Sequence, residues 1–378
     1  MFARRLLAQS EWKLLSRSFR RCWLLLLLAL LSWTASHKVT KRVHTGRHRL
    51  RLLVSYVYFE SQLHHQCEIQ NKRTNLALFM KNALVPSQEN IRFVFTVPGN
   101  SPPVDDLLRI TRFPLSSKEG EIIKNAMENK LPNVLFSLKV GAPSADLCHH
   151  QGTIRAEISK ADFDFILTLN DGARGPFTRT IEQDRGSRQS VPFSGVPLWI
   201  EPYVLRMTKF DDVALMGPFM SCEIDTHVQT WASMFDVRAL RTVLLHMQAS
   251  CAPSMEWGDA VIISEVGLSV AVLNSKLSLS SVVPNFERFT RYHREALRNG
   301  VTEIRDKLLG CANPTTHAGS APFVGDALLH EAVFVKYGGE VWRERLLSPE
   351  FEEVILSSSA KDLNLEDSLH CIRDRTFS

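Results

Sequence analysis

One segment constrains the fold more than any other: residues 163–169 read FDFILTL and are apolar at nearly every position. A strand with one solvated face alternates apolar and polar residues, whereas a strand covered by helices on both faces is apolar throughout. The segment therefore predicts a central strand of a parallel sheet. It runs directly into a turn that contains glycine and carries three polar side chains, those of Asn170, Asp171 and Arg174.

Strand patterns and helix patterns alternate along the rest of the chain. β-branched and aromatic runs predict further strands over residues 51–59, 91–97, 134–140 and 213–216. Apolar residues at helical spacing predict helices over residues 75–84, 237–247 and 262–273, the second with Asp236 as its N-cap. This alternation predicts an α/β fold with an open, mostly parallel sheet of Rossmann type.

Ligands of open α/β sheets bind beyond the carboxyl ends of the strands, so Asp171 is a candidate binding residue. A carboxylate there can hold a divalent cation that bridges the two phosphates of a nucleotide-sugar. Arg174 could add a fork-shaped donor for phosphate. The alternative is that Asn170, Asp171 and Gly172 are present because these residues favour tight turns.

A second acidic pair, Asp162 and Asp164, spells Asp-x-Asp and invites interpretation as a metal motif. The pair precedes the apolar strand and belongs to the edge of the sheet remote from the binding crevice. We interpret it as a solvated start of the strand.

Four segments resemble, in the same order, a glycosyltransferase family related to the bacterial rhamnan-synthesis proteins, with algal, fungal and protist members. They are residues 169–177 (LNDGARGPF), 215–223 (LMGPFMSCE) followed by His227-Val228-Gln229, 265–269 (EVGLS) and 330–339 (HEAVFVKYGG). Together they cover the chain from about residue 51 to 339. The chain departs from the family at residues 146–150 (DLCHH), where relatives carry an acidic, glycine-containing patch, and in a polar insert at residues 182–194.

The resemblance implies a GT-A-like sheet and transfer of a sugar from a nucleotide-sugar donor to a glycan or glycoprotein, with Mn²⁺ or Mg²⁺. Asp171 is then the metal or diphosphate contact, assisted by Asn170 and Arg174 at the donor. Glu265, in a largely apolar stretch, is a candidate general base, because burial raises the pKa of a carboxyl group.

Two further donor-binding candidates are His227, which could ligate metal or orient phosphate, and Lys336, on a strand-like run. Each candidate also has a structural interpretation. Glu265 could be an acid favoured by a helix dipole, His227 a hydrogen-bonded structural residue, and Lys336 a residue at the end of a strand.

The cysteines favour a disulfide over a metal site. Two histidine- and cysteine-rich clusters could compose a zinc site: His64, His65 and Cys67, and Cys148, His149 and His150. We expect instead a disulfide between Cys67 and Cys148 with solvent-facing histidines.

The N-terminus carries an apolar run at residues 22–33 (CWLLLLLALLSW) with basic residues on both sides. We expect a signal-anchor transmembrane helix over residues 22–36, although about 20 apolar residues are usual for a span. A cleaved signal peptide and an organellar transit peptide are the alternatives. The expected arrangement is a single-pass type II protein of the Golgi or endoplasmic reticulum, with its body in the lumen.

The expected domain layout follows from these features: a cytosolic basic tail at 1–21, the anchor at 22–36, a stem at 37–50, a catalytic domain at 51–345 and a peripheral tail at 346–378. The formal net charge of +5 comes from the N-terminal extension, so we expect no nucleic-acid partner. One functional alternative is a non-catalytic, membrane-tethered carbohydrate-binding or scaffold protein with a degenerate transferase fold. Another is an imported organellar α/β enzyme of a different kind.

Overall fold

The computed structural model describes residues 48–60, 66–84, 88–98, 117–139, 146–176, 193–221, 226–251, 260–283, 287–299 and 333–336. The chain divides into two compact units, Met1–His48 and Arg49–Ser378, and the second contains almost all of the described residues. The predicted basic tail, anchor, C-terminal tail and residues 37–47 of the stem lie outside the described ranges. Within those ranges, every helix is too short or too polar to cross a bilayer.

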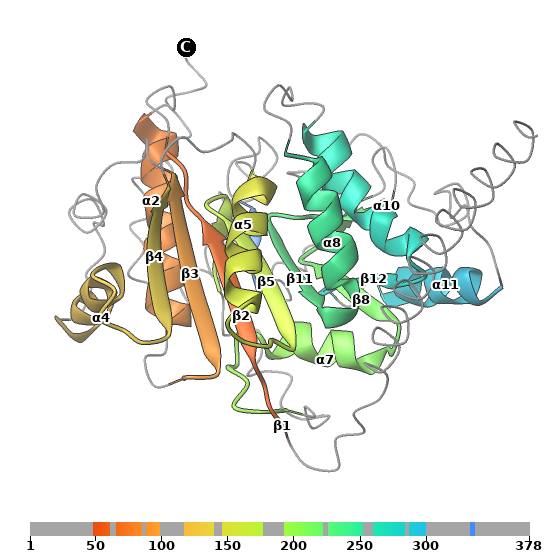
Figure 1. Ribbon diagram of the computed structural model, residues 1–378, viewed down its shortest axis with the longest axis horizontal. Coiled ribbons are helices and arrows are strands. Elements are labelled where there is room, and N and C mark those ends of the chain that lie inside the picture. Colours follow the sequence, from red (N-terminus) through yellow and green to blue (C-terminus); the bar gives the residue numbers. More distant parts are fainter. Residues whose placement is uncertain are drawn as a thin grey trace, which may run out of the picture. The chain divides into compact units, whose positions relative to one another are not determined.

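A seven-stranded sheet forms the centre of the second unit (Figure 1). Its strands, in spatial order, are β12 (Ser278–Ser281), β8 (Val213–Gly217), β11 (Ala232–Asp236), β5 (Phe165–Asn170), β2 (Leu52–Val57), β3 (Ile91–Pro98) and β4 (Val134–Lys139). β11 runs antiparallel to both of its neighbours, and every other adjacent pair is parallel. The predicted α/β fold with a mostly parallel sheet is confirmed, and the predicted central strand is β5.

Helices cover both faces of this sheet. Successive residues of β2 face opposite sides, so that Ser55 contacts His150 while the ring of Tyr56 lies 5.1 Å from that of Phe79. The first face carries α5 (Asp146–Ile158), which contacts α8 (Val237–Ala249), and α8 in turn contacts α10 (Gly267–Asn274). The second face carries α2 (Gln66–Ala83). Coverage on both sides explains why β5 is apolar at nearly every position.

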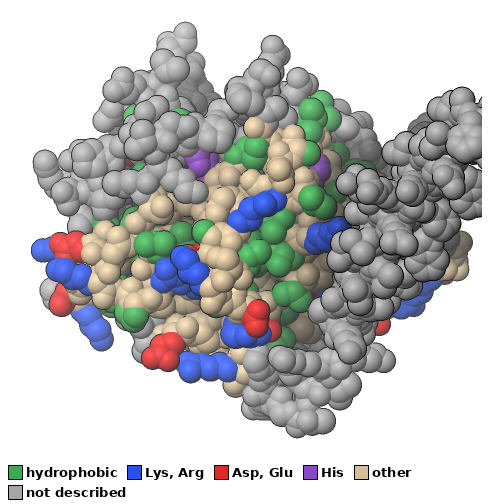
Figure 2. All heavy atoms as spheres, viewed as in Figure 1, with side chains coloured by type: hydrophobic (Ala, Val, Ile, Leu, Met, Phe, Trp, Pro, Cys, Tyr) green, Lys and Arg blue, Asp and Glu red, His purple; other side chains and the backbone are tan. Residues whose placement is uncertain are grey.

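The remaining helices and short strands surround these layers. The helices are α4 (Ser117–Met127), α7 (Glu201–Lys209), α11 (Glu287–Arg298) and the π-helix η2 (Ala260–Val266). The short strands are β1 (His48–Arg49), β6 (Ala173–Arg174), β7 (Phe193–Ser194), β9 (Met220–Ser221), β10 (His227–Val228) and β13 (Val335–Lys336). On the face that Figure 2 shows, the described side chains are a mixture of apolar, basic and acidic groups.

The structure confirms one helix prediction, changes two and adds helices that were not predicted. The helix predicted over 75–84 is part of α2, which begins at Gln66. α8 begins after Asp236 as predicted, and the carboxylate of Asp236 accepts the N–H of Arg238 at 2.9 Å. The helix predicted over 262–273 consists of two parts, η2 and α10. α5 was not predicted, because its buried face includes the polar side chains of His149, His150 and Thr153, which hide the apolar periodicity.

Candidate functional site

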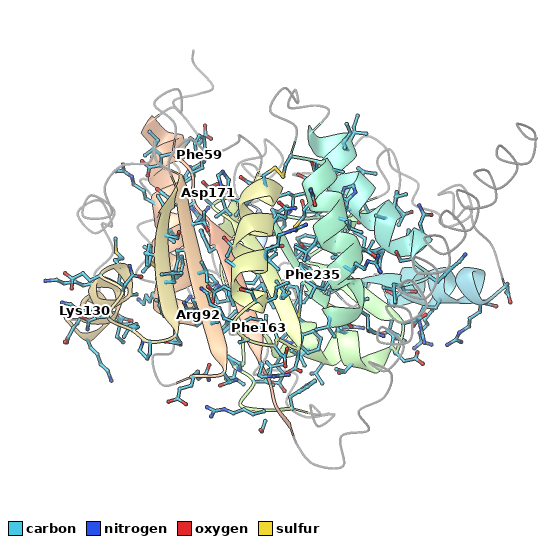
Figure 3. All side chains as sticks on the ribbon, in the orientation of Figure 1. Phe59, Arg92, Lys130, Phe163, Asp171 and Phe235 are labelled. Atoms are coloured by element: carbon cyan, nitrogen blue, oxygen red, sulfur yellow. A yellow bond between two sulfur atoms is a disulfide. The ribbon has the colours of Figure 1, made fainter. Side chains whose placement is uncertain are left out.

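Asp171 follows β5 at the carboxyl edge of the parallel strands and is 8% exposed. Figure 3 shows it close to Phe59, which follows β2, whereas Phe163 lies toward the opposite ends of the strands. One carboxylate oxygen of Asp171 accepts the backbone N–H of Phe59 at 2.8 Å. The same oxygen lies 3.5 Å from the ammonium nitrogen of Lys72 on α2. The end of β5 is therefore joined to β2 and α2 through one carboxylate.

Asn170 connects the same edge to α5. Its amide nitrogen donates to the carboxylate of Asp146, the first residue of α5, at 2.9 Å. Its side-chain oxygen accepts the N–H of Gly172 at 3.0 Å and so closes the turn. Asn170 thus closes the turn, while Asp171 makes contacts that a turn alone does not need.

The electrostatics of the site favour a proton on Asp171. Burial is the largest effect and, together with the neighbouring negative charge of Asp146, it raises the pKa of the Asp171 carboxyl to about 7. The positive charge of Lys72 and the N–H of Phe59 oppose this shift. The pKa of Asp171 is thus raised toward neutrality, and a cation bound beside it would favour the ionised form.

Arg174 is a buried residue of β6, which follows the turn. It is 2% exposed, and its Nε donates to the side-chain oxygen of Asn75 at 2.7 Å. The amide nitrogen of Asn75 donates in turn to the carbonyl oxygen of Asp171 at 2.8 Å. The structure thus brings Asn170, Asp171 and Arg174 together, and Asn75 links the guanidinium of Arg174 to the backbone of Asp171.

Three charged residues of this edge were not predicted from the sequence: Glu60, Lys72 and Arg73. Arg73 forms a buried ion pair with Glu60, whose second oxygen lies 2.7 Å from the Arg73 guanidinium, and the hydroxyl of Tyr58 also donates to Glu60. One signal in the sequence could have found Lys72. Glu68 and Lys72 are four residues apart, as in an ion pair on a helix, and they indicate that the helix predicted over 75–84 starts earlier.

The first and last family-like segments are neighbours in space. β6 pairs antiparallel with β13, so that Val335 lies opposite Arg174 and Lys336 opposite Ala173. Gly175 has φ +138°, and a Cβ there would lie 2.5 Å from the carbonyl oxygen of Val333. The predicted strand at Lys336 is present, and its side chain lies outside the described part.

The second and third segments also meet. β9 pairs antiparallel with β10, and the backbone N–H of Val228 in β10 donates to the hydroxyl of Ser269 in α10 at 3.1 Å. Gly217 allows a close crossing, because a Cβ there would lie 2.8 Å from the carbonyl oxygen of Gln229. His227 lies on β10, and Glu265 lies on η2, which contacts β10. These two candidates thus belong to the β8–β12 half of the domain.

The cysteine and histidine predictions were wrong in two respects. Cys148 forms its disulfide with Cys251, which follows α8, and not with Cys67. His149 and His150 are 5% and 2% exposed rather than solvent-facing, because α5 packs them against the sheet. The sequence alone could not choose the partner, since Cys251 becomes a neighbour only when α5 and α8 pack together.

The acidic residues before β5 lie where the sequence predicted. Asp164 accepts the backbone N–H of Arg51 at 2.8 Å, and the side chain of Asp162 is 88% exposed. They start the strand at the edge remote from Asp171, as Figure 3 indicates for Phe163.

The carboxylates at the site are those of Asp146 and Asp171. The described ranges contain no group of three or more His, Cys, Asp or Glu side chains that could hold a metal. The two neighbouring carboxylates, Asp146 and Asp171, fit the common arrangement in which one or two carboxylates bind Mg²⁺ and phosphate oxygens supply further ligands. Among the described residues, the donor set thus fits a metal that shares its ligands with the phosphate oxygens of a diphosphate.

No protein-family profile matches the sequence, and no curated protein matches it. The fold is similar to the mannosyltransferase PcManGT from Pyrobaculum calidifontis in complex with GDP-Man and Mn²⁺: 8% identity, TM-score 0.33, 67% of this chain and 61% of that one. It is similar to the glycosyltransferase GlyE of Streptococcus pneumoniae TIGR4: 9% identity, TM-score 0.34, 81% of this chain and 62% of that one. It is also similar to the galactosyltransferase LgtC in complex with donor and acceptor sugar analogues: 12% identity, TM-score 0.33, 84% of this chain and all of that one.

Proposed function

We propose that this chain is a glycosyltransferase that moves a sugar from a nucleotide-sugar donor to a glycan or glycoprotein acceptor. The observation that carries the proposal is the environment of Asp171. Asp171 follows the central strand β5, and its carboxylate lies beside the ammonium of Lys72. The negative charge of Asp146 raises the pKa of this carboxyl. The carboxyl edge of an open α/β sheet is where such folds bind nucleotides.

The spatial arrangement of the family-like segments supports a GT-A-like fold. The segment that contains Asp171 is paired with the segment that contains Lys336, and the segment that contains His227 contacts the helix that follows Glu265. Segments that are far apart in the sequence are thus built into one domain, as a shared binding function requires.

The reaction assigns a role to each group of residues. Lys72 offers positive charge to the diphosphate as the bond between the sugar and the phosphate breaks. The oxygen of the acceptor hydroxyl bonds to the anomeric carbon of the donor sugar, and Glu265 accepts the proton that this hydroxyl loses. Four further residues are proposed to bind the donor: Asn170, Arg174, His227 and Lys336.

A divalent cation is part of the proposal. Asp171 and Asp146 would hold Mn²⁺ or Mg²⁺, which would supply neutralising charge to the departing diphosphate. Cation binding would displace the proton that burial favours on Asp171.

The proposal extends to the cellular setting and the domain layout. Residues 22–36 anchor the chain in the Golgi or endoplasmic reticulum membrane, the catalytic domain at 51–345 lies in the lumen, and residues 346–378 are peripheral. The disulfide between Cys148 and Cys251 supports an oxidising compartment. N-terminal sequencing of the native protein distinguishes this arrangement from import with a cleaved transit peptide, which would remove the apolar run.

One observation favours the alternative of a non-catalytic carbohydrate-binding protein: the carboxylate of Asp171 already has a cationic neighbour, Lys72. Calorimetric titration of the full chain with UDP and GDP, with Mn²⁺ or with a chelator, separates the two functions. The enzyme should bind a nucleotide more tightly with Mn²⁺ and lose this gain in Asp171→Ala, while Asp164→Ala, at the other end of β5, keeps it. Absence of nucleotide binding by the unchanged chain contradicts the transferase.

A further inference from the structure

A second group of residues lies beside the end of β5, where β11 runs antiparallel to β5: Phe219, His227, Gln229 and Trp231. The carbonyl oxygen of Trp231, the residue before β11, accepts the backbone N–H of Asn170 at 3.1 Å. The ring of Trp231 lies 6.2 Å from that of Phe219, whose carbonyl oxygen accepts the N–H of Gln229 at 3.0 Å. The side-chain amide nitrogen of Gln229, Nε2, lies 3.3 Å from Nε2 of His227. These contacts form a continuous connection from His227 to the residue before Asp171.

Two side-chain atoms of this group have no hydrogen-bond partner in the described part of the chain: Nε1 of Trp231 and Oε1 of Gln229. Each of the two side chains is 3% exposed. An unpaired buried donor or acceptor costs free energy of folding, and nearly all such atoms in native proteins are paired with protein, water or a ligand. Here one unpaired donor and one unpaired acceptor occur in the same group.

This combination matches the chemistry of a sugar. A hydroxyl group can donate one hydrogen bond and accept others, so an indole N–H and an amide oxygen together satisfy one hydroxyl or two neighbouring ones. The rings of Trp231 and Phe219 add apolar surface against which the C–H bonds of a sugar ring can pack. A phosphate matches less well, because its oxygens are acceptors and Oε1 of Gln229 is an acceptor too.

We propose that Trp231 and Gln229 form a sugar subsite next to Asp171, with His227 as a positioning residue that orients the amide of Gln229. The inference rests on the proposed function, because Asp171 marks the place of the donor diphosphate. The ligand chemistry is a sugar hydroxyl, which can come from the donor sugar or from the acceptor glycan.

Trp231→Phe removes the indole N–H and keeps an aromatic ring. Trp199→Phe is the matched control, since Nε1 of Trp199 is also buried without a partner among the described residues. Trp199 lies on the other face of the sheet, with its ring 6.0 Å from that of Phe79 on α2.

The full chain and both variants are titrated with UDP- and GDP-sugars and with UDP and GDP alone. Initial rates with a glycan acceptor give its KM.

If the subsite binds the donor sugar, Trp231→Phe weakens nucleotide-sugar binding about fivefold, the loss of one neutral hydrogen bond, and leaves UDP and GDP binding unchanged. If it binds the acceptor, the KM of the acceptor rises by a similar factor while donor binding is unchanged. Either result supports the subsite, provided that Trp199→Phe changes neither quantity.

Gln229→Met tests the acceptor atom independently and decides the question if Trp231→Phe does not fold, which thermal unfolding reveals. Unchanged binding and KM in the folded variants overturn the subsite and leave the transferase proposal standing. An equal loss in Trp199→Phe also overturns it, because the effect is then one of core packing. Absence of nucleotide and nucleotide-sugar binding by the unchanged chain overturns the proposed function and the subsite with it.

Discussion

The carboxylate of Asp171, which follows β5, lies 3.5 Å from the ammonium of Lys72 on α2, although the two residues are far apart in the sequence. This ion pair joins the end of β5 to α2. It also opposes the increase in the pKa of Asp171 that burial and Asp146 cause. The charge state of the candidate site near neutral pH therefore depends on a tertiary contact.

Asp171 should make the stability of the fold depend on pH. Its pKa is about 7 in the folded state and about 3.9 in an unfolded chain, so between these values the folded state binds more protons. The resulting stability is fully present below about pH 4 and is lost as the pH rises through 7. Asp171→Asn does not titrate and should remove this fall in the free energy of unfolding, measured with urea between pH 4.5 and 7.5.

Asp162→Asn is the control for this experiment, because the side chain of Asp162 is 88% exposed at the other end of the strand. It should keep the pH dependence of the unchanged chain. The same pH dependence in Asp171→Asn would show that this carboxyl is not buried as described.

Lys72→Met should shift the pH dependence of nucleotide binding. Lys72 lowers the pKa of Asp171, so its removal raises that pKa further. If binding needs the ionised carboxylate, the acidic limb of the affinity profile should move to higher pH, by about one unit. Lys81→Met is the control, since Lys81 lies on the same helix but pairs with Glu119 at 3.7 Å. A shift to lower pH would contradict the assigned role of the ion pair.

Gly175→Ala should destabilise the fold. Its φ of +138° is unfavourable for alanine, and the added Cβ would lie 2.5 Å from the carbonyl oxygen of Val333. The backbone strain alone costs about 1–3 kcal/mol. Gly120→Ala, in α4, meets nothing within 4 Å and should instead stabilise the protein by about 0.5–1 kcal/mol. Thermal unfolding of both variants should show changes of opposite sign, and equal changes would argue against the close approach of Val333.

The disulfide between Cys148 and Cys251 should stabilise the fold by about 2–5 kcal/mol, because it closes a loop with a sequence separation of 103 residues. Changing both residues to serine should lower the free energy of unfolding by this amount, and a reducing agent should have little further effect on stability in the double variant. Peptide mapping without reduction should recover the two cysteines in one linked pair. A pair of Cys148 with Cys67 would contradict the structure.

Several site features were accessible from local sequence. The apolar run of residues 163–169 predicted a strand covered on both faces, and Asp171 followed at its carboxyl end. The cap at Asp236 was also predicted, because its bonds to the next residues are local. α5 was missed, since its buried face mixes histidine and threonine side chains with the apolar ones of Leu147 and Ile154.

By itself, the sequence determined five strands of the central sheet, the start of α8 and the edge of the sheet at which Asp171 emerges, because burial patterns and capping depend on residues a few positions apart. Only the tertiary structure decided that Lys72 neighbours Asp171, that β13 pairs with β6, and that Cys251 is the partner of Cys148. These contacts join segments that are far apart along the chain. They exist because helices pack on both faces of one sheet, and no local periodicity encodes which distant side chains that packing brings together.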